Sequence, residues 1–571
     1  MNFVWYYIFQ LFQSGKDGLF MKRLISIALA LVLCASVSLT AFAAEHEGVL
    51  PSGVSYSNIE AVIDAYVKKN RGTTAAVSIA VFTGSDVLLE KSYGYSDIEN
   101  TIVNDKNTVF EWGSCTKLLV WTSVMQLVEK GKIDLNKDIR TYLPDGFFKK
   151  LKFDTPISML NLMNHNAGWQ ETLTDLFIED KEDVKKLEDA LQLSEPEQIN
   201  KPGTVLAYSN WGSALAGYIV ERVSGQSFDD YVHGHIFEPL GMEHTALNPT
   251  LSDNKWVAEK RRLEKCYSTK NESLGTCLYN LPLYPAGKAT GTISDFIKFG
   301  QTFMTAKEGK LPLFEKKKTL DEMLSPSLFY ADGTTARNCH GFWTDELGVS
   351  VLWHNGGTLG STSWFAFDPK SGTGMIILTN QCNESIYNCG LLPLVFGKYK
   401  SGAGKVSSKD ISGMYVSSRT CFKGFAKPYS LLCQMRFVSK GDGIYSVPGA
   451  NHTAASIGEN SYLLDMGGVK QFVIYSSTNE DGHTALQLPG ADYVEVNGYG
   501  VVAEYILLGL FMLAALYGFF ALIINFICFF KTQKGSRRIG NIPCHCKYFC
   551  CYYSNYVCLY ISKIVFWFGT A

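Results

Sequence analysis

The tetrad Ser114-Cys115-Thr116-Lys117 is the first group of residues with the types and spacing for covalent chemistry, and it leads into an apolar stretch over residues 118–127. Because positions three apart share one face of a helix, the lysine amine is expected to reach the serine hydroxyl. Burial would lower the pKa of Lys117 and let it take the proton of Ser114, which makes the serine a nucleophile. The same spacing is common on solvated helix surfaces, so the motif needs partners.

One partner is Tyr208-Ser209-Asn210, which follows the turn Lys201-Pro202-Gly203 and precedes an amphipathic stretch over residues 212–223. Tyr208 and Asn210 can project from this turn while Ser209 points away. A phenol beside an ammonium ionises more easily, which makes Tyr208 a candidate general acid or base, and Asn210 a candidate ligand for a substrate amide or for the lysine. The structural alternative is a tyrosine packed at a helix start with its hydroxyl capped.

The other partner is Trp353-His354-Asn355-Gly356-Gly357, a sequence typical of a strand edge. Its glycines allow a ligand to approach the backbone closely, and its backbone N–H groups could face an oxyanion.

S-x-x-K, Y-x-N and H-x-G in this order resemble the serine β-lactamase and penicillin-binding-protein superfamily. Within it, the chain is most similar to the class C β-lactamase-like serine hydrolases, which include esterases and D-amino-acid peptidases. The resemblance covers roughly residues 56–400. Further matching stretches begin at Gly131, His165, Glu238 and Gly291.

The resemblance implies that Ser114 is acylated, that Lys117 and Tyr208 share proton transfer, and that Asn210 orients the substrate amide. It also implies that the N–H groups of Ser114 and Gly357 form an oxyanion hole. The residues that it places on the substrate-binding strand are His354, Gly356 and Gly357. It implies no metal and no cofactor.

One departure from the family pattern bears on the substrate. His354 stands where many penicillin-recognising members have lysine, and Asn355 follows it in place of threonine, so a substrate carboxylate would need Arg337 or Lys288 instead. This favours a peptidase or an esterase over an efficient β-lactamase. The expected substrates are therefore amides or esters, either small molecules or peptidoglycan-type peptides: a D-amino-acid peptide, a β-lactam or an ester. A sensor or scaffold of penicillin-binding type with little turnover is the alternative.

The elements around these motifs indicate a mixed α/β fold. Residues 58–69 carry apolar side chains at helical spacing, whereas residues 75–87 and 364–378 are β-branched and aromatic runs that predict strands. Taken together with the resemblance, which implies a β-lactamase-like fold, they predict an antiparallel sheet flanked by helices, with a helical subdomain, over residues 45–400. A linker over 401–408 and a small all-β domain over 409–498 follow.

The two ends of the chain predict export and anchoring. Residues 1–44 end in a basic, apolar and A-x-A order typical of a secretory signal peptide, with Met21 as a possible true start. Residues 505–530 carry no charge and are long enough for a transmembrane helix. The tail over 531–571 is basic and cysteine-rich, with a possible second membrane segment at 548–568, and the positive-inside rule places it in the cytoplasm. The catalytic domain is thus expected on the extracytoplasmic side of the cell membrane.

Composition and residue spacing argue against a nucleic-acid-binding protein and against a metalloenzyme. The 571 residues include 52 Lys and Arg against 54 Asp and Glu, and a net charge of −2 argues against nucleic-acid binding. The histidines show no H-E-x-x-H spacing, which disfavours a metalloenzyme. Three local cysteine pairs could close short loops in an oxidising compartment, with free thiols as the alternative: Cys266/Cys277, Cys382/Cys389 and Cys421/Cys433.

Overall fold

The computed structural model describes residues 48–172, 177–179, 184–304, 311–399, 409–424, 426–448, 451–467, 470–479 and 481–535, with the side chains of 528–535 left out. The predicted signal peptide, the linker over 401–408 and the tail beyond residue 535 lie outside these residues. The mixed α/β architecture is confirmed: an antiparallel sheet with flanking helices, a small all-β domain and a terminal apolar helix.

The main sheet joins strands from both ends of the catalytic region. Its nine strands follow the order β3-β2-β1-β12-β11-β10-β9-β8-β7, so that β1 pairs antiparallel with β12 in the register Val77 to Thr379. The strands of this sheet are β1 (Ala76–Thr83), β2 (Val87–Asp97), β3 (Ile102–Val103), β7 (Leu328–Phe329), β8 (Ala336–Cys339), β9 (Phe342–Glu346), β10 (Ser350–Gly357), β11 (Thr362–Asp368) and β12 (Thr373–Thr379). A small second sheet holds β4 (Phe110–Glu111), β6 (Thr290–Gly291) and β5 (Thr245–Ala246).

The two runs expected as single strands each contain a turn. Residues 75–87 hold β1 and the first residue of β2, and residues 364–378 hold most of β11 and β12. The break falls at Gly84-Ser85-Asp86 in the first run and at Pro369-Lys370-Ser371-Gly372 in the second, where turn-forming residues interrupt the apolar pattern. Each run is therefore part of a hairpin.

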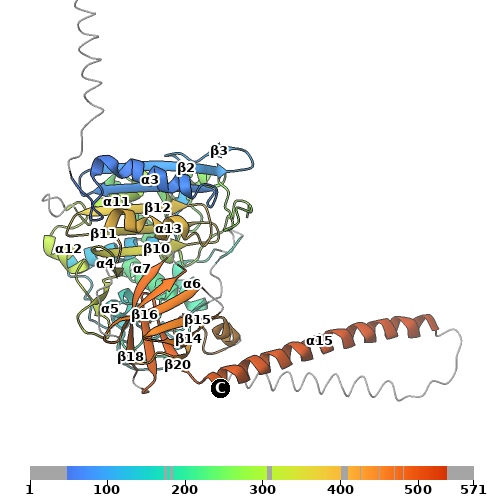
Figure 1. Cartoon of the computed structure of the whole chain (residues 1–571). Helices are drawn as coiled ribbons and strands as arrows, with labels where there is room; N and C mark the ends of the chain where they lie inside the picture. The colour runs from blue at the N-terminus through green and yellow to red at the C-terminus, as the bar shows by residue number, and fades with distance from the viewer. Residues whose placement is uncertain are drawn as a thin grey trace, which may run out of the picture.

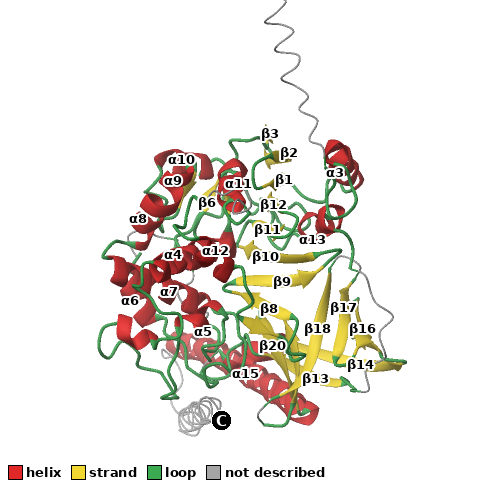
Figure 2. Ribbon diagram, turned by 90° about the vertical axis from the view of Figure 1, so that its left-hand side faces the viewer, coloured by secondary structure: helices red, strands yellow, loops and turns green. Residues whose placement is uncertain are grey.

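Helices cover both faces of the main sheet, and the side chains of β1 therefore point alternately into two hydrophobic cores, one on each face. Val77, Ile79 and Val81 pack with Ile59 and Ile63 of α3 (Ile59–Lys69), while Ala80 and Phe82 join the larger core on the other face. Figure 2 shows α3 and α13 on one side of the sheet, with α4, α11 and the helical subdomain on the other.

The remaining helices of the catalytic region are mostly short. They are α4 (Lys117–Glu129), α5 (Met159–Met163), α6 (Leu187–Leu193), α7 (Asn210–Ser224), α8 (Phe228–Val232), α9 (Glu238–Leu240), α10 (Lys255–Arg261), α11 (Ile293–Gln301), α12 (Lys317–Met323), α13 (Ile386–Gly390) and α14 (Leu392–Phe396). Short 3-10 turns are η1 (Tyr56–Asn58), η2 (Gly113–Thr116), η3 (Ile139–Tyr142), η6 (Tyr284–Ala286) and η8 (Lys427–Leu432), and η5 (His233–Phe237) is a π-helical turn.

The small all-β domain is a closed barrel. Its strands pair in sequence order and β20 returns to β13, which leaves no open edge. The strands are β13 (Gly413–Ser417), β14 (Gln434–Gly441), β15 (Ile444–Val447), β16 (His452–Gly458), β17 (Ser461–Met466), β18 (Gln471–Thr478), β19 (Thr484–Leu488) and β20 (Ala491–Val496).

Aromatic and aliphatic side chains fill the interior of the barrel. Tyr415, Phe437, Tyr462, Ile474 and Leu486 belong to one buried cluster. The interior is thus a packed core, as expected for a barrel of this size.

A long helix leaves the barrel directly after its last strand. Within α15 (Gly498–Gly535), residues 498–527 are long and apolar enough to cross a membrane. Its first turns contact the barrel, since the Tyr505 hydroxyl donates to the Leu431 carbonyl at 2.9 Å and Lys427 lies 3.8 Å from Glu504. Figure 1 shows the rest of α15 projecting away from the body of the protein.

The eight cysteines whose side chains the structure describes are free thiols, including those of the three local pairs.

Candidate active site

Ser114 and Lys117 lie where η2 runs into α4, a helix whose residues 117–127 are all buried. The Lys117 side chain is fully buried (0% exposed), because α4 is surrounded by the large core on almost every side. Its Nζ lies 3.1 Å from Ser114 Oγ, 2.8 Å from Asn210 Oδ1 and 2.6 Å from the carbonyl oxygen of Ala286. The predicted contact between the lysine and the serine is therefore present.

Three oxygen atoms surround the Lys117 nitrogen. Burial, and after it the charge of Arg419, holds the pKa of Lys117 well below its usual range. A neutral Nζ donates its two N–H groups to the Asn210 and Ala286 oxygens, and its lone pair is then left to accept the Ser114 hydroxyl proton. The site thus holds a base beside the serine.

Tyr208 is positioned by contacts on both sides of its backbone. Its N–H donates to the carbonyl of Gly490 in the barrel at 2.9 Å, and its ring packs 4.4 Å from the ring of His165. The next residue, Ser209, caps α7 by accepting from the Gly212 N–H, which turns its side chain away and sets Asn210 at the first helical position. The ring of Tyr208 then lies 4.8 Å from Lys117 Nζ.

The Tyr208 hydroxyl is a buried acid. Among the described residues it makes no hydrogen bond of good geometry. Burial raises its pKa, although Ser114 and the Arg419 guanidinium act in the opposite direction. The raised pKa keeps the phenol protonated at neutral pH, and the lowered pKa of Lys117 favours the neutral form of the amine beside it, so that one group can donate a proton and the other can accept one.

Strand β10 presents alternate residues to the site. Trp353, Asn355 and Gly357 line the cavity beside Ser114, whereas His354 and Gly356 do not. His354 is 1% exposed, its Nδ1 lies 2.8 Å from the Asn355 carbonyl, and its Nε2 has no partner among the described residues. Burial and the nearby Lys117 lower its pKa to about 3, so the ring is neutral.

Glycines bring β10 and η2 into direct contact. A Cβ on Gly356 would lie 2.9 Å from the Ser114 nitrogen, and a Cβ on Gly113 would lie 2.8 Å from the Gly357 nitrogen. The two backbone nitrogens expected to form the oxyanion hole thus belong to segments that only glycine allows to approach so closely. Both Ser114 and Gly357 line the cavity.

The two cations considered as carboxylate ligands lie elsewhere. The Arg337 guanidinium is buried against Asp492 at 2.8 Å and donates to the Leu488 carbonyl at 2.6 Å. The Lys288 amine donates to the Tyr279 carbonyl at 2.8 Å. Neither residue lines the cavity.

The cavity around Ser114 encloses about 500 Å³ and lies between the catalytic region and the barrel. The sequence did not predict the barrel side of the cavity, because its residues belong to no motif, and Arg419 and Lys470 are not distinguished from the other basic residues of this domain. The lining residues from the barrel are Arg419, Lys470, Phe472, Leu488, Pro489, Gly490, Ala491 and Tyr493. Those from the catalytic region, besides residues already named, include Phe177, Tyr279, Leu281, Leu283, Trp343 and Thr358.

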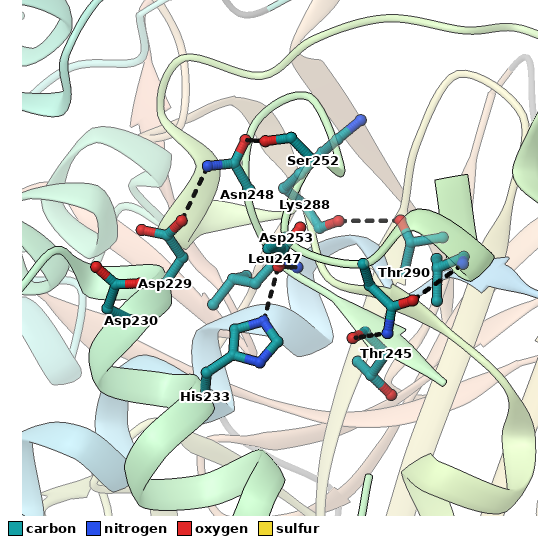
Figure 3. A network of polar contacts seen from close by, with 12 residues as sticks. Asp229, Asp230, His233, Thr245, Leu247, Asn248, Ser252, Asp253, Lys288 and Thr290 are labelled. Atoms are coloured by element: carbon teal, nitrogen blue, oxygen red, sulfur yellow. Dashed lines mark hydrogen bonds and ion pairs between the residues drawn. The ribbon is translucent and has the colours of Figure 1, made fainter. Parts of the chain in front are cut away.

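A second polar cluster lies outside the cavity. His233 Nε2 is 2.8 Å from Asp253 Oδ2, which also accepts from the Leu247 N–H, and Asn248 donates to Asp229 at 2.9 Å (Figure 3). These contacts fix the loop after β5. Among the described residues no group of three His, Cys, Asp or Glu side chains is placed to hold a metal ion.

The family model described as Beta-lactamase matches residues 59–385. Protein flp of Staphylococcus aureus (strain N315) is 24% identical over 336 residues, which are 58% of this chain and 64% of that protein. The putative penicillin-binding protein PbpX of Bacillus subtilis (strain 168) is 26% identical over 317 residues, 54% of this chain and 73% of that protein. The crystal structure of SurE shares the fold at 15% identity, with a TM-score of 0.54, over 77% of this chain and 99% of that chain. The chain therefore spans less than two thirds of Protein flp.

Proposed function

The chain belongs to the Beta-lactamase family, and on that premise we propose that it is a serine hydrolase that acts through an acyl-enzyme on amide or ester substrates. The observation that carries the proposal is the buried Lys117 amine, which bridges Ser114 Oγ and Asn210 Oδ1. A buried lysine with a lowered pKa beside a serine hydroxyl is typical of a functional site, because such an amine can take the proton of a nucleophile directly.

The proposed reaction has two halves, acylation of Ser114 and hydrolysis of the acyl-serine, and the same residues act in both. Ser114 Oγ attacks the carbonyl carbon while Lys117 takes its proton, and the N–H groups of Ser114 and Gly357 hold the oxyanion. Tyr208 then protonates the leaving amine or alcohol and recovers a proton from Lys117. Water cleaves the acyl-serine by the same steps in reverse, which releases the acid and restores the serine.

The proposal includes anchoring through α15, with the catalytic region on the extracytoplasmic side. Its support is the apolar helix over residues 498–527 together with the basic residues that follow it in the sequence.

The test is covalent labelling of the full-length protein in detergent with a fluorophosphonate probe. We expect an adduct on Ser114, its loss in Ser114→Ala, and turnover of a generic ester by the unmodified protein. Labelling of another residue, or undiminished labelling of Ser114→Ala, would refute the mechanism. A stable label without ester turnover would instead favour the sensor or scaffold.

A further inference from the structure

The barrel reaches the catalytic serine through the segment that joins β13 to β14. Arg419 on this segment lines the cavity together with Ser114, and its guanidinium carbon lies 4.7 Å from the centre of the Tyr208 ring. The side chain lines the cavity and is 44% exposed, so solvent reaches it. A ligand beside Ser114 would therefore meet this cation.

Arg419 is held in place by an interaction that leaves part of its guanidinium free to bind a ligand. Its Nε donates to Glu171 Oε2 at 2.7 Å, and the neighbouring backbone is fixed because the Glu171 N–H donates to the Thr420 carbonyl at 3.1 Å. Among the described residues Glu171 is the only hydrogen-bond acceptor bonded to the Arg419 guanidinium; the backbone N–H of Arg419 donates to Ser417 Oγ. The two terminal nitrogens therefore remain for a ligand, and a guanidinium fixed at Nε presents them to a carboxylate in a planar pair.

A second cation on the same wall strengthens the charge of the cavity. Lys470 Nζ lies 4.3 Å from the ring centre of Phe472 and 4.6 Å from that of Trp364, and no ion pair of Lys470 is found within the described part of the chain. Burial lowers its pKa. No aspartate or glutamate is among the described residues that line the cavity, and Glu171, the partner of Arg419, is not a lining residue, so the charged side chains of the lining are cations. A wall of one charge sign favours a ligand of the opposite sign.

We propose that Arg419 binds a carboxylate of the acyl donor, so that the barrel selects substrates with a free carboxylate near the bond that is cleaved. This deepens the proposed function and rests on it. The carboxylate could lie on the acyl side, as in a dicarboxylic monoester, or on the leaving group, as at the C-terminus of a peptide. The chemistry at Arg419 is the same in both cases.

Binding is measured first, in full-length Ser114→Ala, where no turnover occurs. Two matched ligand pairs are titrated by calorimetry: succinate monobenzyl ester against benzyl butyrate, and an acetylated D-dipeptide against its C-terminal amide. We expect the carboxylate member of at least one pair to bind more tightly, and the additional change Arg419→Gln to weaken that member by roughly 10- to 100-fold, the scale of one charged hydrogen bond. The neutral member should change by less than about threefold, and Arg419→Lys should recover part of the loss.

Lys423→Gln is the matched control, since it removes an exposed cation from the same segment outside the cavity. It should leave both members of each pair unchanged. Equal weakening of charged and neutral ligands by Arg419→Gln, or no preference for a carboxylate in either pair, would overturn the proposal. Because fluorophosphonate labelling of Ser114 is measured separately in the unmodified protein, its failure would refute the acyl-enzyme and not the anion site.

Discussion

Replacing Gly356 with alanine tests whether the approach of β10 to η2 builds the acylation site. The added Cβ would lie 2.1 Å from the Trp112 carbonyl oxygen, 2.5 Å from Ser363 Oγ and 2.9 Å from the Ser114 nitrogen, whereas real contacts begin near 3.0 Å. The backbones of β10 and η2 must therefore separate by about 0.9 Å. The Trp112 carbonyl belongs to the backbone, so this clash cannot be relieved by rotating a side chain and requires the strand to move.

Two magnitudes follow from this displacement. Overpacking a buried position costs about 1–3 kcal/mol of the free energy of unfolding. A misplacement near 1 Å of groups that must align costs about a hundredfold in rate. Since the strand carries the N–H of Gly357 away from that of Ser114, we expect Gly356→Ala to lower the rate of fluorophosphonate labelling about a hundredfold in protein that still melts cooperatively.

Gly234→Ala is the matched control outside the cavity, in η5. A Cβ at Gly234 would meet nothing within 4 Å, and its backbone does not need positive φ. The rate of labelling should stay within about threefold of that of the unmodified protein, and the melting temperature should stay within a few degrees. The reasoning is refuted if Gly356→Ala labels as fast as the unmodified protein, or if the two alanine variants lose the same activity.

Two further outcomes follow from the buried titratable groups. Lys117→Met and Tyr208→Phe should each slow labelling of Ser114 by about a hundredfold or more, and the double variant should be little worse than either, because one step needs both groups; additive losses would contradict this. The hydrogen bond to Asp253 raises the pKa of His233 above 6.5 against the effect of burial, so its stabilisation is complete below pH 6.5 and is lost as pH rises through the folded pKa. The melting-temperature difference between the unmodified protein and His233→Gln should therefore be largest below pH 6.5 and shrink at higher pH, and a difference independent of pH would show that the ion pair is not the cause.

The local part of the site could be predicted from the sequence because its geometry is local. Ser114 and Lys117 are three residues apart, and Tyr208 and Asn210 lie at the start of a helix that Ser209 caps. The fold class was predictable for a similar reason, since periodicity distinguishes strands from helices. The prediction of one strand in each of the two apolar runs was wrong, because each run contains a short turn. The few turn residues are outnumbered by the β-forming residues around them.

The barrel side of the cavity could not be predicted, because it depends on contacts between distant segments. The Tyr208 N–H meets the Gly490 carbonyl, and Arg419 meets Glu171, with no shared motif in either case. The alternation of β10 was also decisive: it directs Asn355 to the cavity and buries His354, although the sequence marks His354 as the conspicuous residue.

A single residue, Asn497, separates the end of β20 from the start of α15. So short a joint, with Tyr505 and Lys427 braced across it, gives the barrel little freedom to swing about the helix. If α15 lies in a bilayer, the cavity between the barrel and the catalytic region stays at a nearly constant height above the lipid headgroups. The active site would then move by lateral diffusion within a thin layer parallel to the membrane. Substrates would be selected by the distance of their scissile bond from the membrane surface as well as by their chemistry.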